Sequence, residues 1–218
     1  MKYPLKRKLL HLFFPSRCPV CGEFIGAFDR FCAGCADKPV RYEGNFSIEG
    51  ANSFTAAYEY DDNIKPAVFL LKDGTCGNAA YALGGALADR LRENGIDDAI
   101  DIVVPAPMYK RDIRRRGFNQ SALIAKEVGR ILGVPADCRA AVKTRPTHTQ
   151  KGLSGSERKV NLSNAFSASD KLKGKRVLLV DDICTTGSTL REVTAAIKKA
   201  GAASVHCACC CKTISHKD

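Results

Sequence analysis

The clearest hydrophobic pattern in the chain is a run of four apolar residues that gives way abruptly to acids, hydroxyls and glycine. Residues 177–189 read VLLVDDICTTGST. A continuous apolar run of this length predicts a strand buried on both faces, and the spacing of Leu190, Val193 and Ile197 predicts a helix after it. The pattern therefore predicts a strand, a polar loop and a helix in succession.

Other apolar segments repeat this alternation of strand and helix. Strands are expected at residues 53–60, 100–104 and 204–213, and helices at residues 63–71, 78–93 and in the stretch that ends at residue 131. Such alternation predicts an α/β fold with a mostly parallel sheet and flanking helices, whose ligands lie beyond the carboxyl ends of the strands. Pro105 and the acids after Val180 fall at such ends.

The polar loop has the chemistry of an anion site. It gathers backbone N–H groups and the positive end of a helix dipole around one point, together with the hydroxyls of Thr185, Thr186, Ser188 and Thr189. Gly187 lets the backbone approach the anion, because it has no Cβ. These features suit a phosphate monoester.

Two carboxylates precede the loop, where they would repel a phosphate. Asp181 and Asp182 suit a sugar instead, because a carboxylate accepts hydrogen bonds from a vicinal diol and can face Mg²⁺. The combined site predicts a phosphorylated sugar as the ligand. An ordinary buried strand followed by a helix N-cap is the alternative interpretation.

Four cysteines near the amino terminus have the spacing of a metal site. Cys18 and Cys21 form one C-x-x-C pair, and Cys32 and Cys35 form a second pair after ten intervening residues. Four thiolates at this spacing predict a tetrahedral structural zinc site, closed to catalysis because sulfur fills every position. Redox chemistry at one C-x-x-C leaves the second pair unexplained, whereas an iron centre with the same ligands stays open.

Length and cysteine usage fit this division of the chain. The 218 residues are enough for one medium domain and a small appendage, which we place at residues 50–218 and 1–45. The eleven cysteines are unusually many and odd in number, but their placement is typical of free thiols and favours a reducing cytoplasm over a disulfide framework. The apolar segment at residues 9–14 is short and lacks a cleavage site, so neither a membrane span nor a signal peptide is expected.

Excess basic charge changes the expected partners. The formal net charge of +11 favours a polyanion such as nucleic acid, with a generally basic surface as the alternative. A basic leader at residues 2–13 has helical spacing and is expected to dock within the chain, on a partner or on nucleic acid. Residues 110–120 predict a basic loop before a helix, and residues 143–161 predict a functional lid.

The motif at residues 177–189 resembles the phosphoribosyl pyrophosphate (PRPP) signature of type I phosphoribosyltransferases. A wider pattern comprises the two C-x-x-C motifs, residues 116–120 (RGFNQ), residues 145–147 (RPT) and the signature. Over nearly the whole chain this pattern resembles the ComF family of competence-associated proteins, which includes the GntX-like proteins. The resemblance implies a type I phosphoribosyltransferase fold with a small N-terminal four-cysteine zinc ribbon.

The resemblance also implies a site. In type I enzymes the acids hold the ribose hydroxyls and the loop holds the 5′-phosphate, which implies Mg²⁺-PRPP bound by Asp181, Asp182, Thr185, Thr186, Gly187, Ser188 and Thr189. Arg114, Arg115 and Arg116 are implied for the pyrophosphate. Lys151 or Arg158 of the lid would stabilise departing pyrophosphate, and the expected catalytic residues are Asp181, Asp182 and Lys151.

Three functions fit these features. The resemblance implies a PRPP-binding protein of DNA uptake, natural transformation or nucleic-acid metabolism, which as an enzyme would transfer the ribosyl group to an acceptor that the sequence does not name. The second is a non-catalytic module that binds single-stranded DNA and is regulated by PRPP or a nucleotide. The third is an adaptor that contacts proteins of the competence machinery through the zinc ribbon.

Overall fold

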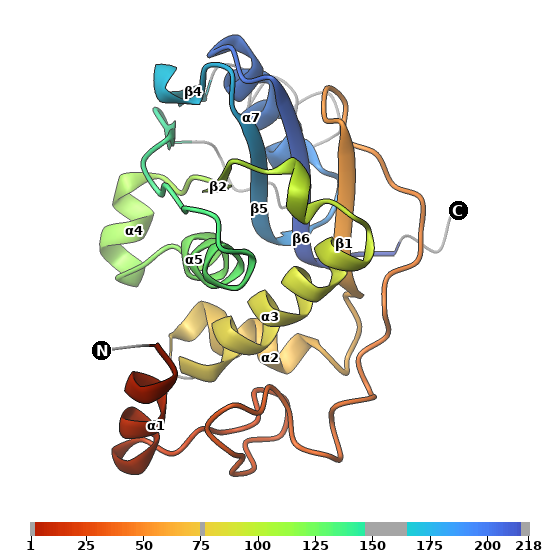
Figure 1. The fold of residues 1–218 in the computed structure, drawn as a ribbon, viewed down its shortest axis with the longest axis vertical. Helices are drawn as coiled ribbons and strands as arrows, with labels where there is room; N and C mark the ends of the chain where they lie inside the picture. The colour runs from red at the N-terminus through yellow and green to blue at the C-terminus, as the bar shows by residue number, and fades with distance from the viewer. Residues whose placement is uncertain (1–2, 75–76, 147–164, 215–218) are drawn as a thin grey trace.

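A four-stranded parallel sheet forms the centre of the protein (Figure 1). The computed structural model describes residues 3–74, 77–146 and 165–214. The strand order is β1-β6-β5-β2, with β1 at Ser53–Glu59, β2 at Ile102–Pro105, β5 at Arg176–Cys184 and β6 at Ser204–Lys212. All three neighbouring pairs are parallel, which confirms the predicted sheet.

Three helices cover one face of the sheet. They are α2 (Lys65–Asp73), α3 (Gly77–Glu93) and α5 (Gln120–Leu132). Leu178 and Val180 of β5 share a buried cluster with Leu83, Leu87 and Ile124 of the helices. Alternate residues of β5 therefore face this layer, as the geometry of a strand requires.

The opposite face is covered by α7 (Ser188–Lys199) and by a two-stranded hairpin of β3 (Ala141–Lys143) and β4 (Phe166–Ala168). Val177 and Leu179 of β5 pack here with Val193 and Ile197 of α7. Short 3₁₀ turns at Asp97–Ala99 (η1) and Asp170–Leu172 (η2) precede β2 and β5. With helices on one face and a helix and hairpin on the other, β5 and β6 are buried on both sides.

Two sequence expectations about these elements were wrong. The strand of the signature was expected to comprise the four apolar residues 177–180, but β5 continues through the acids because its pairing with β6 extends to Cys184. Residues 110–120 were expected to be a loop, but α4 occupies Lys110–Arg116. Lys, Arg and Ile tolerate helix well, and Gly117, with φ of +88°, ends the helix by donating its N–H to the Ile113 carbonyl.

The segment predicted to be a lid, residues 143–161, begins at the last residue of β3 in the β3–β4 hairpin. Lys143 pairs with Phe166 in this antiparallel ladder, which sequence reasoning did not predict because each strand has only three residues. Residues 147–164, including His148, Lys151 and Arg158, lie outside the described residues. The lid itself stays a prediction.

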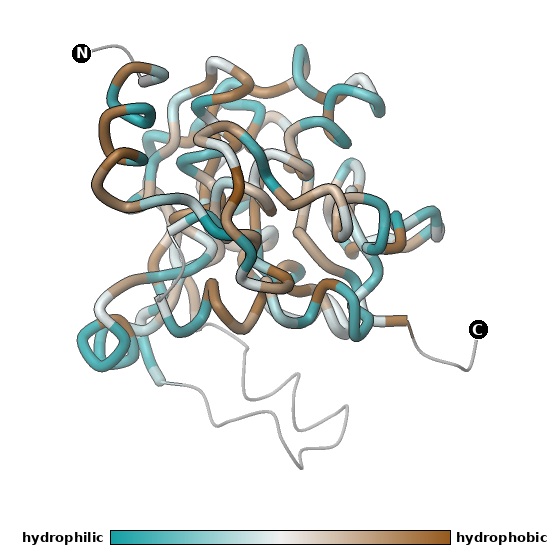
Figure 2. Tube along the Cα trace, turned by 90° about the horizontal axis from the view of Figure 1, so that it is seen from below, coloured by the Kyte–Doolittle hydropathy of each residue, from teal (hydrophilic) through white to brown (hydrophobic). Residues whose placement is uncertain are grey.

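The amino-terminal part consists of α1 (Tyr3–Phe13) followed by turns and isolated bridges. The predicted basic helix is present and docks within the chain, because the Arg7 guanidinium lies over the Tyr81 ring of α3 at 3.4 Å. Its apolar side is exposed, with Leu12 75% and Phe13 74% accessible, and brown residues recur along α1 in Figure 2. Within the described ranges, none of the helices is long and apolar enough to cross a membrane.

Candidate active site and metal centre

The carboxyl edge of the sheet brings the acids and the polar loop together. After Cys184 the chain turns at residues 185–187, and α7 begins at Ser188. Asp181 and residues 183–190 line one small cavity of about 30 Å³. Six of the seven signature residues expected to bind PRPP, all but Asp182, therefore surround a single point.

Gly187 is required by the shape of the loop. Its φ of +72° lies in the left-handed region, which other residues adopt at a cost. A Cβ built at this position would stand 2.4 Å from Cδ1 of Ile48, and the ring of Phe46 is 3.3 Å away. The segment that joins the cysteine-rich part to β1 therefore lies against the back of the loop.

The loop offers hydroxyl and amide donors. The Thr186 and Ser188 hydroxyls are 2.8 Å apart, and Thr185 and Thr186 are exposed. Within the described chain no side chain caps the N-terminus of α7, which leaves its first N–H groups available for an anion. This is the arrangement that a phosphate monoester needs.

Asp181 is held in place by hydrogen bonds and disfavoured as an anion. Its Oδ1 accepts hydrogen bonds from the Ser121 hydroxyl at 2.7 Å and from the Asp182 backbone N–H at 2.9 Å. Burial, and then the neighbouring Asp182 carboxylate, raise the pKa of Asp181 well above its usual range. Strongly perturbed carboxyl groups of this kind occur most often at functional sites.

Two supporting residues escaped the sequence analysis. Ser121 lies at the start of α5, and Lys72 of α2 places its Nζ 3.7 Å from Oδ2 of Asp182. Both residues come from other elements that meet the sheet edge only in the folded chain. The Asn119 N-cap, which accepts from the Ser121 N–H, was the one local signal that fixes the start of α5.

The arginines expected to bind pyrophosphate lie on α4. Arg114, Arg115 and Arg116 are all exposed, and Arg115 is 3.8 Å from Asp112 of the same helix. They follow β2, whose carboxyl end is at the same edge of the sheet as that of β5. Their contact with a ligand stays a prediction.

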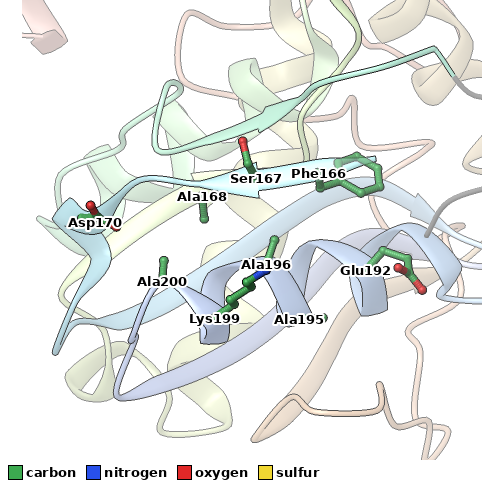
Figure 3. A pocket seen from close by; sticks show the side chains of 9 residues that line it. All are labelled: Phe166, Ser167, Ala168, Asp170, Glu192, Ala195, Ala196, Lys199 and Ala200. Atoms are coloured by element: carbon green, nitrogen blue, oxygen red, sulfur yellow. The ribbon is translucent and has the colours of Figure 1, made fainter. Parts of the chain in front are cut away.

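A larger cavity of about 360 Å³ lies elsewhere, between β4 and α7 (Figure 3). Its wall is largely alanine, with Glu192 and Lys199 of α7 and Asp170 of η2 as charged members. None of the signature residues lines it. We therefore place the candidate active site at the smaller cavity of the loop.

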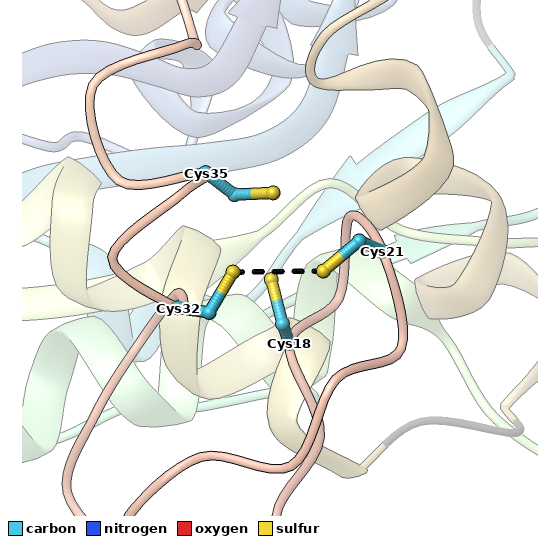
Figure 4. Close-up of side chains that lie close together, drawn as sticks. All are labelled: Cys18, Cys21, Cys32 and Cys35. Atoms are coloured by element: carbon cyan, nitrogen blue, oxygen red, sulfur yellow. Dashed lines mark hydrogen bonds between the residues drawn. The ribbon is translucent and has the colours of Figure 1, made fainter.

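The four predicted metal ligands converge at one point (Figure 4). Their sulfur atoms all lie within 4.8 Å of one another, and the Cys21 and Cys32 sulfurs are 3.5 Å apart. A tetrahedral zinc site with Zn–S bonds of about 2.3 Å has sulfur–sulfur edges of about 3.8 Å. The described cluster therefore fits a structural metal ion.

Tight turns form both knuckles of this cluster. Gly22, with φ of +81°, donates its N–H to the Cys18 carbonyl at 2.9 Å, and the Cys35 N–H bonds to the Cys32 carbonyl at 3.0 Å. Burial raises the pKa of Cys18, but backbone N–H groups at Cys32, Cys21 and Val20 lower it to about 7 overall. The pKa of Cys32 is raised, first by a hydrogen bond with Glu23, and burial raises the pKa of Cys35, so of these three cysteines Cys18 is the one whose thiolate form is favoured.

The cysteine-rich part is fastened to α3. The Asn78 side-chain amide, 5% exposed, donates to the backbone carbonyls of Arg17, Asp29 and Arg30 at 3.2–3.4 Å. Arg30 in turn pairs with Asp89 of α3, passing Gly85 so closely that a Cβ there would lie 2.4 Å from its Nε. A metal ion at the four cysteines would therefore stabilise an element that is joined to the α/β domain.

Comparison with known proteins identifies the family. A family model described as "Phosphoribosyl transferase domain" matches residues 77–218. DNA utilization protein YhgH of Escherichia coli is 32% identical over 201 residues, covering 90% of this chain and 84% of that protein. Competence protein F of Haemophilus influenzae is 37% identical over 192 residues, covering 84% of this chain and 79% of that protein. The chain belongs to the ComF family of phosphoribosyltransferase-domain proteins.

Among solved structures, the purine phosphoribosyltransferase from Pyrococcus horikoshii Ot3 is 25% identical, with a TM-score of 0.38, covering 60% of this chain and 71% of that one. The ComF-family assignment confirms the resemblance that the sequence pattern suggested, including the four-cysteine cluster ahead of the transferase domain.

In this ComF-family chain, two Asp→Asn substitutions are expected to change stability in opposite directions. The folded state raises the pKa of Asp181, so the stability that this group contributes is present at low pH and lost as pH rises through the raised pKa. Arg176 lowers the pKa of Asp101 to about 2, so that contribution is present at neutral pH and lost as pH falls toward about 2.

At neutral pH, Asp181→Asn should therefore raise Tm and Asp101→Asn should lower it, each by about 2 °C or more in thermal melts. A lower Tm for Asp181→Asn would contradict the interpretation of this carboxylate as a destabilising group kept for a ligand.

Proposed function

We propose that this protein binds Mg²⁺-PRPP at the carboxyl edge of β5 and acts in bacterial DNA uptake or DNA utilization. The observation that carries the proposal is the folded signature, in which Asp181 and the loop of Thr185 and Thr186 line one cavity beneath the start of α7. The printed names of the relatives, DNA utilization protein and Competence protein F, support the cellular role.

The proposed ligand matches the chemistry of the site. The carboxylates of Asp181 and Asp182 would accept hydrogen bonds from the ribose hydroxyls, and the loop would hold the 5′-phosphate with N–H and hydroxyl donors. Mg²⁺ would carry the pyrophosphate and neutralise part of its charge. The remaining charge of the pyrophosphate would be neutralised by Arg114, Arg115 and Arg116 and by Lys151 of the lid.

As an enzyme, the protein would make one bond and break one. A nucleophilic acceptor would bond to C1 of the ribose while the bond from C1 to pyrophosphate breaks, and the pyrophosphate would leave with Mg²⁺. The residues of this chain would contribute position and charge rather than covalent chemistry. The carboxylates would stabilise positive charge that develops on the ribose.

A second candidate function is binding of single-stranded DNA on a basic surface formed by α4 and β3. α4 carries five exposed cations, namely Lys110, Arg111, Arg114, Arg115 and Arg116. Burial lowers the pKa of Lys143 in β3, while Asp112 of α4 raises it and Arg145 lowers it, so Asp112 of α4 is near enough to β3 to act on Lys143. Such a surface suits a phosphate backbone.

We also propose that the ion at Cys18, Cys21, Cys32 and Cys35 is zinc with a structural role. Four thiolates complete a tetrahedral zinc site and leave no position for substrate. The surrounding residues 14–40 bury little apolar surface, because Phe14, Phe24 and Phe28 are exposed, so the ion would supply folding energy for this part. This part is also the surface that we propose for proteins of the competence machinery.

The ligand prediction is tested by calorimetric titration of Mg²⁺-PRPP. The wild-type protein should bind, and Asp182→Asn should bind about tenfold or more weakly, because hydrogen bonds to charged groups contribute about 1.5–3 kcal/mol each. Asp170→Asn, an exposed acid of η2, is the matched control. The double variant Asp181→Asn/Asp182→Asn should show no measurable binding.

Pyrophosphate release then separates the two modes of action. Release that begins when a free base or nucleic acid is added would establish a transferase. Binding without release would leave a PRPP-regulated binding protein, and a wild-type protein that binds no PRPP would refute the proposal.

Metal analysis tests the zinc site. The purified protein should contain one zinc per chain, and Cys32→Ser should lose the metal and melt at a lower temperature. Cys138→Ser, a cysteine between α5 and β3 that is outside the cluster, should keep both the metal and the Tm. Iron in place of zinc would overturn the identity of the ion.

Salt dependence tests the DNA surface. Affinity for a single-stranded oligonucleotide should fall with salt, and Arg114→Ala/Arg115→Ala/Arg116→Ala should reduce the slope of log K against log [salt] by up to about 2, at about 0.7 per lost phosphate contact. Lys171→Ala/Lys173→Ala/Lys175→Ala removes the same charge from exposed positions near β5. Equal effects of the two triple variants would mean that net charge alone drives binding.

A further inference from the structure

A buried lysine lies behind the phosphate loop. Lys212 is the last residue of β6, is only 7% exposed and follows three buried cysteines. It is paired in the sheet with Cys184, the residue from which the loop begins. Lysine is rarely buried in this way without a carboxylate partner.

The ammonium group of Lys212 is bound directly to the loop. Its Nζ donates to the Thr185 carbonyl at 3.0 Å and to the Thr213 carbonyl at 2.7 Å. Among the residues that the structure describes, its recorded partners are these carbonyls and the Phe46 ring, and none is a carboxylate. Within the described part of the chain, no carboxylate therefore compensates this positive charge at the loop.

The bond to Thr185 also orients the loop. The carbonyl of Thr185 and the N–H of Thr186 belong to one trans peptide and point in opposite directions. Because Lys212 holds the carbonyl, the Thr186 N–H is directed away from Lys212. The same bond thus keeps a repelling carbonyl oxygen away from a phosphate and presents a donor to it.

Phe46 holds the lysine in this position. Its ring centroid lies 4.3 Å from Nζ of Lys212, within cation–π distance. The Phe46 ring contacts the Phe54 ring of β1 edge-on, with 5.1 Å between the two centroids, and it also borders Gly187. Phe46 therefore shields the ammonium from water on the side that the ring covers, which strengthens the field of the ammonium at the loop.

We propose that Lys212, positioned by Phe46, is a phosphate-site residue outside the signature, which orients the loop and offsets the charge of the 5′-phosphate from behind it. This inference rests on the proposed function of the same site. It gives a part in ligand binding to Lys212 of the last strand, β6, and to Phe46 in the segment before β1. The effect of Lys212 is confined to the 5′-phosphate, because its contacts are with the loop and not with the acids.

The test compares two ligands that share charge but occupy different parts of the proposed site. Ribose 5-phosphate and Mg²⁺-pyrophosphate are titrated separately by calorimetry into wild type, Lys212→Met and Lys198→Met. Met keeps the length and apolar character of lysine, and Lys198 is an exposed lysine of α7 that controls for net charge. Lys212→Met should bind ribose 5-phosphate about tenfold or more weakly and bind pyrophosphate as wild type does.

A second variant keeps the lysine and removes the ring. Phe46→Leu should weaken the binding of ribose 5-phosphate about threefold and leave the binding of pyrophosphate unchanged. The reason is that the Lys212 ammonium is then less well held and less shielded from water. This variant also provides the test if Lys212→Met does not fold, which its thermal melt would reveal.

The outcomes separate this inference from the function on which it rests. Wild-type affinity of Lys212→Met for ribose 5-phosphate would overturn the inference while leaving PRPP binding intact. Equal losses for both ligands would show that Lys212 only stabilises the fold, and would overturn it as well. A wild-type protein that binds neither ligand would refute the proposed function and the inference together.

Discussion

Parallel pairing between β5 and β6 is the interaction on which the rest of the structure depends. It runs from Arg176 opposite Ser204 to Cys184 opposite Lys212, so both strands end at the same edge of the sheet. Because parallel strands end together, the pairing alone places the acids, the loop and the buried lysine at one edge of the sheet. A shift of one residue in this register would turn every side chain of β5 to the other layer.

The candidate site is built from groups that oppose one another electrostatically. Asp181 is disfavoured as an anion by burial and by Asp182, whereas Lys212 is a buried cation with no carboxylate partner among the residues that the structure describes. Each of these costs folding free energy in the absence of ligand. A phosphorylated sugar carries diol donors for the acids and an anion for the lysine. One ligand would therefore offset both of these unfavourable charges. The large buried clusters on either face of the sheet supply the stability that makes this arrangement tolerable.

What the sequence could predict follows from how local each signal is. The strand, loop and helix at residues 177–189 and the paired cysteines are continuous patterns, and both are recognisable without the fold. Ser121, Lys72 and Lys212 are ordinary residues that acquire a role only when distant elements meet at the sheet edge. Residues 110–116 were misassigned because a run of arginines fits an exposed helix as well as a loop. The domain boundary between residues 45 and 50 stays a prediction.

The position of β6 in the sheet has a consequence for how the chain folds as it is made. β6 lies between β1 and β5, although it is the latest of the four strands in sequence. Until residue 212 has left the ribosome, β1 has no partner in the sheet and β5 exposes an unpaired edge. The nascent chain would hold a gap between β1 and β5 that β6 fills last. A chaperone would have to cover the exposed edges of β1 and β5 until β6 has been made.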